Sequence, residues 1–215
     1  WHELMLQQAT GRNLTVVQKS GTDIWRSSSA GQAFGFTPEA DIGSALAIGS
    51  RSDSAPCRWH PATLWIGIGC ERFSSFELIE RAVDACLQAS GLALEAVAGI
   101  SSIEAKGDEP ALLHFCEQRG WPLRLLSAHA LAEVTVPTPS AVVMAEMGTA
   151  SVAEASALLA SGHEAQLLQT KRIFHAGSGE KGAVTVAIAE AAQALAPQRG
   201  ELHLIGSGPC LLYTS

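Results

Sequence analysis

The amino-acid sequence predicts an α/β fold: a three-layer domain with a mostly parallel sheet, plus an N-terminal partial α/β segment. From residue 62 onward, short apolar runs alternate with longer segments of helical periodicity, a pattern typical of alternating strands and helices. Glycine and proline stand between these segments, where turns are expected. The chain of 215 residues is 47% hydrophobic and only 16% charged, so it can bury a core.

The elements of the main domain are predicted from these runs. Strands are expected at 62–68, 97–103, 123–126, 165–169 and 183–189, and helices at 75–90, 109–119, 128–134, 140–146 and 152–161. The helix at 75–90 has the clearest pattern, because its apolar residues recur on one face. These residues are Phe76, Ile79, Val83 and Leu87.

Capping residues predict where several helices begin and end. Ser74 with Glu77, and Ser151 with Glu154, have the spacing of a capping box. Asp108 is expected to cap the helix at 109–119. Glycine readily adopts the left-handed conformation that ends helices, and it follows four of the predicted helices, at Gly91, Gly120, Gly148 and Gly162.

The chain divides into segments of different character. Residues 1–60 hold short strands at 14–18 and 44–50, with loop-like Gly/Ser-rich stretches at 27–35 and 49–56. Residues 61–196 form the main domain, and residues 197–209 read as the first strand and glycine turn of a further α/β domain that is cut off. Residues 210–215 match the translation of a transposase end sequence used in sequencing libraries, so we expect them to be an adapter artefact.

Composition narrows the function classes. With 14 Lys and Arg against 21 Asp and Glu, the formal net charge is −7, which argues against a nucleic-acid partner. No apolar run is long enough for a bilayer and no signal-peptide pattern begins the chain, so no membrane partner is expected. The five cysteines are scattered without a C-x-x-C pair, which predicts reduced thiols, a cytoplasmic location and no metal site.

The first group of candidate site residues follows the first strand of the main domain: Gly67, Gly69, Cys70, Glu71 and Arg72. A dinucleotide-binding G-x-G-x-x-G motif fails here, because Arg72 occupies the place of the third glycine. An anion-binding turn at a helix start, assisted by the arginine, fits better. A cysteine at a helix start could be a nucleophile, although a semi-buried, inert thiol is the simpler interpretation.

The second group follows the next strand, so two parallel strands would bring both groups to one sheet edge. Glu104, Asp108 and Glu109 could supply a general base there, and Lys106 a charge clamp or an acid. The alternative is a solvated loop in which Asp108 only caps a helix.

Two further groups are weaker. Gly148, Thr149 and Ser151 form a glycine turn with two hydroxyls at a helix start, which suits a carboxylate or a phosphate; a capping box alone would explain Ser151. Lys171 and Arg172 follow the strand expected at 165–169 and could meet an acidic ligand, or could simply be solvated.

Together these motifs resemble the C-terminal domain of the cobalamin-biosynthesis CbiG/CobE family, the cobalt-precorrin-5A hydrolases. The matching motifs, in order, are residues 65–72, 98–100, Ser102-Ile103 with Lys106, 108–110, Trp121-Pro122, 136–140, 148–155 and 183–189. Residues 16–22 with Trp25 and 59–61 look like the tail of the family's middle region. Two departures stand out: Phe73 replaces the glycine usual after Glu-Arg, and Ala150 replaces a usual proline.

The resemblance implies hydrolytic opening of the precorrin-5A δ-lactone with release of acetaldehyde. We then expect catalysis from Glu71, Lys106 and Glu109. The substrate-binding residues would be Gly67, Gly69, Cys70, Arg72, Asp108, Gly148, Thr149, Ser151 and Lys171. The partner would be a tetrapyrrole (precorrin) whose acidic arms meet these cations, and contacts with other cobalamin-pathway enzymes are expected.

The resemblance also implies which cofactors to expect, and it leaves two alternative functions open. No cofactor is expected in this chain, since cobalt would be carried by the substrate. Residues 197–209 resemble the start of precorrin-3B C17-methyltransferase, which uses S-adenosylmethionine. The domain could therefore be a non-catalytic precorrin-binding module, or the chain could be part of a hydrolase–methyltransferase fusion.

Overall fold

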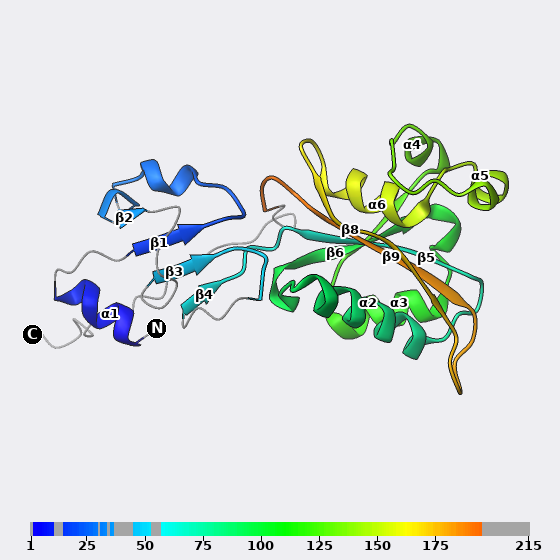
Figure 1. Ribbon diagram of the computed structural model, residues 1–215, viewed down its shortest axis with the longest axis horizontal. Coiled ribbons are helices and arrows are strands. Elements are labelled where there is room, and N and C mark those ends of the chain that lie inside the picture. Colours follow the sequence, from blue (N-terminus) through cyan, green and yellow to red (C-terminus); the bar gives the residue numbers. More distant parts are fainter. Residues whose placement is uncertain are drawn as a thin grey trace, which may run out of the picture.

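The computed structural model describes residues 2–10, 15–29, 31–33, 35–36, 45–52 and 57–194 (Figure 1). The segments expected at 197–209 and 210–215 lie outside these residues. Within the described part, the strands form two sheets, one of four strands and one of five. None of the helices in the described ranges combines the length and apolar character that crossing a membrane requires.

The amino-terminal part, blue to cyan in Figure 1, is a small parallel sheet with strand order β2-β1-β3-β4. Its elements are α1 (His2–Ala9), β1 (Thr15–Gln18), η1 (Ile24–Ser27), η2 (Gly31–Ala33), β2 (Gly35–Phe36), β3 (Ala45–Ile48) and β4 (Cys57–Trp59). The strands expected at 14–18 and 44–50 are β1 and β3. The stretch expected as a loop at 27–35 contains η2 and the first residue of β2.

The larger part is a five-stranded sheet with strand order β7-β6-β5-β9-β8. Its elements are β5 (Leu64–Cys70), α2 (Phe76–Ser90), η4 (Leu94–Ala96), β6 (Val97–Ile103), η5 (Glu104–Lys106), α3 (Pro110–Arg119), β7 (Leu123–Leu126), α4 (Ala128–Ala132), α5 (Ala141–Met147), α6 (Val152–Ser161), β8 (Gln166–His175) and β9 (Ala183–Glu190). Strands β5, β6 and β7 are parallel, whereas β9 runs antiparallel to both β5 and β8.

Helices cover both faces of this sheet, as a three-layer α/β domain requires. Helices α2 and α3 pack on one face, and α6, with α4 and α5 beside it, lies on the other (Figure 1). Strand β5 is central, and its residues 64–68 are all buried, because both of its faces are covered. The predicted fold class is confirmed, with parallel strand pairs in the majority among the described strands.

Helix α6 approaches β5 unusually closely. A Cβ atom added to Gly67 would stand 1.9 Å from the Ala153 carbonyl oxygen and 2.8 Å from the Ala157 nitrogen. The surface of α6 on this side is made of small residues, including Ser156, whose hydroxyl lies at the same contact. Gly67 therefore allows this helix to pack against the strand.

Two predicted caps are wrong. Helix α2 begins after Ser75, and the Ser74 hydroxyl donates to the Glu71 carbonyl at 2.9 Å, so Ser74 and Glu77 form no capping box. Helix α3 begins after Glu109, and Asp108 instead binds Arg72. In both cases a contact with the turn that follows β5 takes the polar side chain from the helix end.

The capping box expected at the start of α6 is half formed. The Ser151 hydroxyl accepts from the Glu154 backbone N–H at 3.4 Å, but the Glu154 carboxylate binds elsewhere. The glycine stops are better predicted: Gly91, Gly120 and Gly148 follow their helices with positive φ angles of 61°, 66° and 69°.

Strand β8 is longer than expected. The sequence predicts its end at residue 169, with Lys171 and Arg172 beyond it, but β8 continues to His175 and pairs with β9 again from Arg172 onward. It is an edge strand with irregular register between Gln169 and Arg172. Polar residues are tolerated there because one side of the strand faces solvent, so the apolar pattern ends before the strand does.

Candidate functional site

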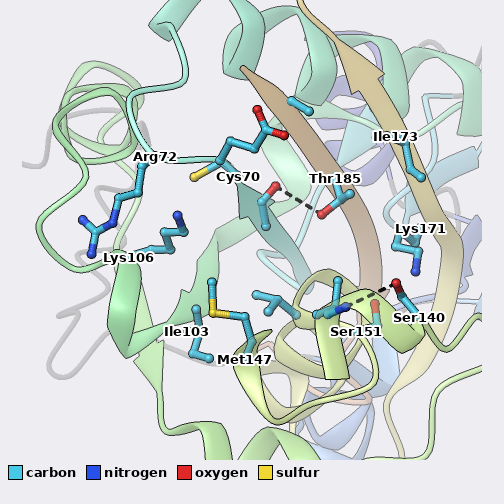
Figure 2. Close-up of a pocket in the computed structure, with 15 residues that line it drawn as sticks. Cys70, Arg72, Ile103, Lys106, Ser140, Met147, Ser151, Lys171, Ile173 and Thr185 are labelled. Atoms are coloured by element: carbon cyan, nitrogen blue, oxygen red, sulfur yellow. Dashed lines mark hydrogen bonds between the residues drawn. The ribbon is translucent and has the colours of Figure 1, made fainter. Parts of the chain in front are cut away.

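A cavity of about 400 Å³ opens where β5 and β6 end, and α5, α6, β8 and β9 complete its walls (Figure 2). The carboxyl ends of parallel strands are the usual place for ligands in α/β folds. The cavity is lined by Gly69, Cys70, Glu71, Arg72, Ile103, Lys106, Ser140, Val143, Met147, Ser151, Val152, Lys171, Ile173, Ala183 and Thr185.

Most of the predicted site residues meet at this cavity. Those that line it are Gly69, Cys70, Glu71, Arg72, Lys106, Ser151 and Lys171. They come from four separate stretches of the chain, which the fold brings to one place. Those that are not among the lining residues are Gly67, Asp108, Glu109, Gly148 and Thr149.

Lys106 is the most unusual residue of the cavity. Its side chain is 3% exposed, yet no hydrogen bond or ion pair engages its Nζ among the described residues. The amine itself is not among the fully enclosed polar atoms that lack a partner, so it reaches the cavity. Burying most of a lysine without an ion pair is still costly. This arrangement leaves an amine ready to bind a negatively charged or polar ligand group.

Arg72 is held at one side of the cavity. Its Nη1 donates to Asp108 at 2.5 Å and its Nη2 donates to the Ala105 carbonyl at 2.8 Å. The hydrogen bond from Arg72 lowers the pKa of the Asp108 carboxyl and raises that of the guanidinium. Asp108 therefore orients Arg72 from outside the cavity.

Cys70 faces the cavity as an ordinary thiol. Burial raises its pKa to about 11, and the nearby charge of Lys106 opposes this shift only in part. The thiol consequently stays protonated near neutral pH, which favours the inert interpretation over a nucleophile.

Glu109 lies under the turn that carries Glu71 and Arg72. It is 1% exposed, and its Oε1 accepts from the Phe73 backbone N–H at 2.8 Å. Phe73 has a φ of 60°, a left-handed conformation that suits glycine better. The other carboxylate oxygen, Oε2, accepts no hydrogen bond and lies 4.0 Å from Arg72 Nη1. Glu109 thus shapes the turn.

On the opposite side of the cavity, Glu154 holds Lys171 in place. This fully buried carboxylate accepts from the Thr138 hydroxyl at 2.7 Å and from the Lys171 backbone N–H at 3.0 Å. The Lys171 Nζ donates to the Thr138 carbonyl at 2.8 Å. Sequence reasoning assigned Glu154 only to a capping box, and the burial of a glutamate could not have been foreseen from spacing.

The turn between α5 and α6 serves the cavity only through Ser151. Gly148 ends α5, and Thr149 is fully buried with a hydroxyl that has no hydrogen-bond partner in the described part of the chain. Sequence reasoning did not single out the apolar lining residues Met147 and Ile173, nor Thr185, whose hydroxyl donates to the Gly69 carbonyl at 3.1 Å.

The fold and the cavity define an α/β domain with a cationic, largely apolar ligand site at the end of its parallel strands. The family model described as "Cobalamin synthesis G C-terminus" matches residues 64–189, and the chain belongs to this family. The match lies within the predicted 61–196 segment. The domain boundaries themselves stay a prediction, as does the methyltransferase start at 197–209 with its S-adenosylmethionine.

Two curated relatives share this domain. The chain is 30% identical over 131 residues to the cobalt-precorrin-5A hydrolase of Priestia megaterium, covering 61% of this chain but only 33% of that enzyme. It is 32% identical over 128 residues to protein CobE of a Sinorhizobium species, covering 58% of this chain and 83% of CobE. The chain thus spans about a third of the hydrolase.

A solved structure shares the fold. The crystal structure of a CobE protein from the cobalamin (vitamin B12) biosynthetic pathway is 32% identical, with a TM-score of 0.52, over 60% of this chain and 91% of CobE. Together with the family match, this likeness supports a role for the chain in cobalamin biosynthesis.

Proposed function

We propose that this domain binds a precorrin by its carboxylate arms and takes part in hydrolytic opening of the δ-lactone of cobalt-precorrin-5A, with release of acetaldehyde. The observation that carries the proposal is the buried Lys106, unpaired among the described residues, in a cavity that also holds Arg72 and Lys171. Precorrins are apolar rings with acidic arms, which suits cations set in apolar walls. The similarity to a cobalt-precorrin-5A hydrolase supports the reaction.

Glu71 is the best-placed general base of the predicted catalytic residues. It lines the cavity, and its carboxylate makes no hydrogen bond or ion pair within the described part of the chain. Glu109 is not among the lining residues, and one of its oxygens is engaged by Phe73. We assign proton abstraction to Glu71 and the shaping of the turn to Glu109.

The hydrolysis then needs only water and these side chains. Water attacks the lactone carbonyl carbon while its proton passes to the Glu71 carboxylate. Lys106 and Arg72 stabilise the negative charge that forms on the carbonyl oxygen, and Lys106 then pairs with the carboxylate arm that the opened lactone becomes. The lactone C–O bond breaks, and the departing oxygen takes the proton back from Glu71, which leaves a hydroxyl and a carboxyl group. Glu71 then removes the proton of this hydroxyl, whose oxygen becomes the carbonyl oxygen of acetaldehyde as the C–C bond to the ring breaks. The electron pair of that bond passes into the conjugated ring, which takes up the proton from Glu71.

The second candidate is a precorrin-binding module without catalysis of its own. One observation favours it: the same domain makes up most of CobE, whereas the hydrolase is about three times as long as the shared region. Under this reading the cavity holds the substrate, and other parts of the longer proteins carry out the chemistry.

The deciding experiment incubates the chain with cobalt-precorrin-5A and measures both binding and acetaldehyde, the latter through alcohol dehydrogenase and NADH. Release of acetaldehyde supports the hydrolase, and Glu71→Gln should then lower the rate about 100-fold while binding is kept. Binding without release supports the module. Absence of binding overturns both.

Arg72→Ala tests the cavity itself. Because Arg72 is half exposed and already paired with Asp108, its loss should weaken binding by about fivefold, less than the loss of a buried charge. Lys181→Met, on the turn between β8 and β9 and outside the cavity lining, is the matched control. Unchanged affinity in Arg72→Ala would remove Arg72 from the site.

A further inference from the structure

We infer that the cavity binds one edge of its macrocyclic ligand through two carboxylate arms at once, one at Lys106 and one at Lys171. The ring itself stays at the opening of the cavity. This inference rests on the proposed function and specifies how the ligand is held. It is carried by the positions of the two lysines, by the wall between them and by the size of the cavity.

The two lysines lie on opposite sides of the cavity (Figure 2). Lys106 comes from η5, after β6, and stands beside Arg72. Lys171 comes from β8. The two amines therefore reach the cavity from different walls, so two separate groups of a ligand can meet them.

Each lysine lacks a carboxylate partner of its own. Neither forms an ion pair with any described residue, whereas Arg81 and Arg119 are paired with acidic side chains. Lys171 has one hydrogen bond, to the Thr138 carbonyl, and its remaining N–H groups are available. Both amines can therefore each take an arm of a ligand.

The position of Lys171 is built by a separate set of contacts. It lies in the irregular stretch of β8 between Gln169 and Arg172, where its backbone N–H leaves the ladder and binds Glu154. Such irregularities redirect a side chain. Because none of these contacts involves Lys106 or Arg72, the two binding points are independent.

Apolar side chains fill the wall between the two lysines. Ile103 and Met147 lie there, and Ile173, which is 58% exposed, stands beside Lys171 (Figure 2). Val152 also lines the cavity. An apolar surface flanked by two cations matches a ring edge that carries two acidic arms. A cavity of about 400 Å³ is near the lower limit for enclosing a drug-sized molecule, so a tetrapyrrole cannot enter whole.

The test measures binding of cobyrinic acid, a corrinoid with free carboxylate arms, by calorimetry. Lys106→Met and Lys171→Met should each weaken binding at least about tenfold, and the double variant about 100-fold, because independent contacts add. The methyl ester of cobyrinic acid should bind far more weakly than the acid. Lys181→Met, outside the cavity lining, should bind like the wild type.

The outcomes separate this inference from the proposed function. If the wild-type chain fails to bind cobyrinic acid, the proposed function fails with it. A second outcome is that the wild type binds while the double variant has the same affinity as the single variant that binds less tightly. In that case both lysines serve one arm, and only the two-arm inference is overturned. Should Lys106→Met fail to fold, Lys106→Gln takes its place in the same cycle.

Discussion

Gly67, inside β5, and the residues from Cys70 to Arg72, where β5 ends, have opposite characters. At Gly67 the strand meets α6 so closely that a single methyl group would collide with the helix backbone. At Cys70 to Arg72 it opens onto a cavity that contains a buried amine without a partner among the described residues. The first stretch is closed and apolar, and the second leaves charge uncompensated.

Along this one strand, Gly67 serves the packing of the fold, and the residues at the strand's end serve ligand binding. In sequence, Gly67 and Gly69 look like one ligand motif, but only Gly69 lines the cavity. Gly67 supports the packing that holds the cavity walls together, since α6 also supplies Ser151 at its N-cap and the lining residue Val152. Substitutions on the two sides should therefore have opposite consequences for stability and for ligand binding.

The largest effect is expected at the packed side. Gly67→Ala places its methyl group against backbone atoms of α6, which cannot yield, so the free energy of unfolding should fall by about 3 kcal/mol or more. Urea denaturation measures this loss. Gly91→Ala is the control: nothing lies within 4 Å of its added methyl group, and its positive φ alone should cost about 1–2 kcal/mol. Equal losses would contradict the packing role of Gly67.

At the cavity side, stability should respond in the other direction. Lys106→Met removes a buried charge that lacks a partner among the described residues, so the free energy of unfolding should stay the same or rise by up to about 2 kcal/mol. Denaturation in urea, alongside the binding measurement, gives both quantities for one variant. A loss of more than about 1 kcal/mol would indicate that the amine is structural.

The turn that follows Arg72 carries backbone strain that can be relieved. Phe73 has a left-handed φ while its side chain is 77% exposed, so Phe73→Gly removes strain and little packing. The free energy of unfolding should rise by about 1 kcal/mol. Phe73→Ala keeps the strain and should bring no gain, so a thermal melt of both variants decides the point.

The smallest effect concerns the ion pair between Arg81 on α2 and Glu180 on the turn between β8 and β9. The hydrogen bond from Arg81 lowers the pKa of Glu180 from 4.5 to about 2. The folded pKa lies below the ordinary one, so this pair stabilises the fold above pH 4.5 and loses its effect as the pH falls toward 2. Glu180→Gln should flatten this part of the stability profile, and Glu77→Gln, at an exposed position of α2, should leave it unchanged.

Local patterns predicted much of the larger domain. The amphipathic helix at 75–90 and the strands at 97–103 and 123–126 match α2, β6 and β7. These features depend on short-range periodicity and on glycine at helix ends, so they can be read from neighbouring residues. The placement of Lys106 near the end of β5 was also foreseen, because parallel strands end at the same edge.

Local sequence patterns did not predict the long-range contacts of the site. Arg72 and Asp108 are 36 residues apart, and the capping spacing concealed their pairing. Glu154 had a local explanation at a helix start, yet its carboxylate holds Thr138 and Lys171. A polar side chain that can satisfy a nearby backbone group gives no sign in sequence that a distant partner will take it instead.

The sequence by itself determined the α/β class, the order of most elements and the residue types available for an acidic ligand. It did so because helix periodicity, turn chemistry and charge are local properties. Only the tertiary structure decided that Gly67 packs under a helix, that β8 extends past Lys171 and that Lys106 is buried opposite Lys171. These outcomes depend on which surfaces meet once the sheet is covered, and packing and desolvation between distant segments decide that.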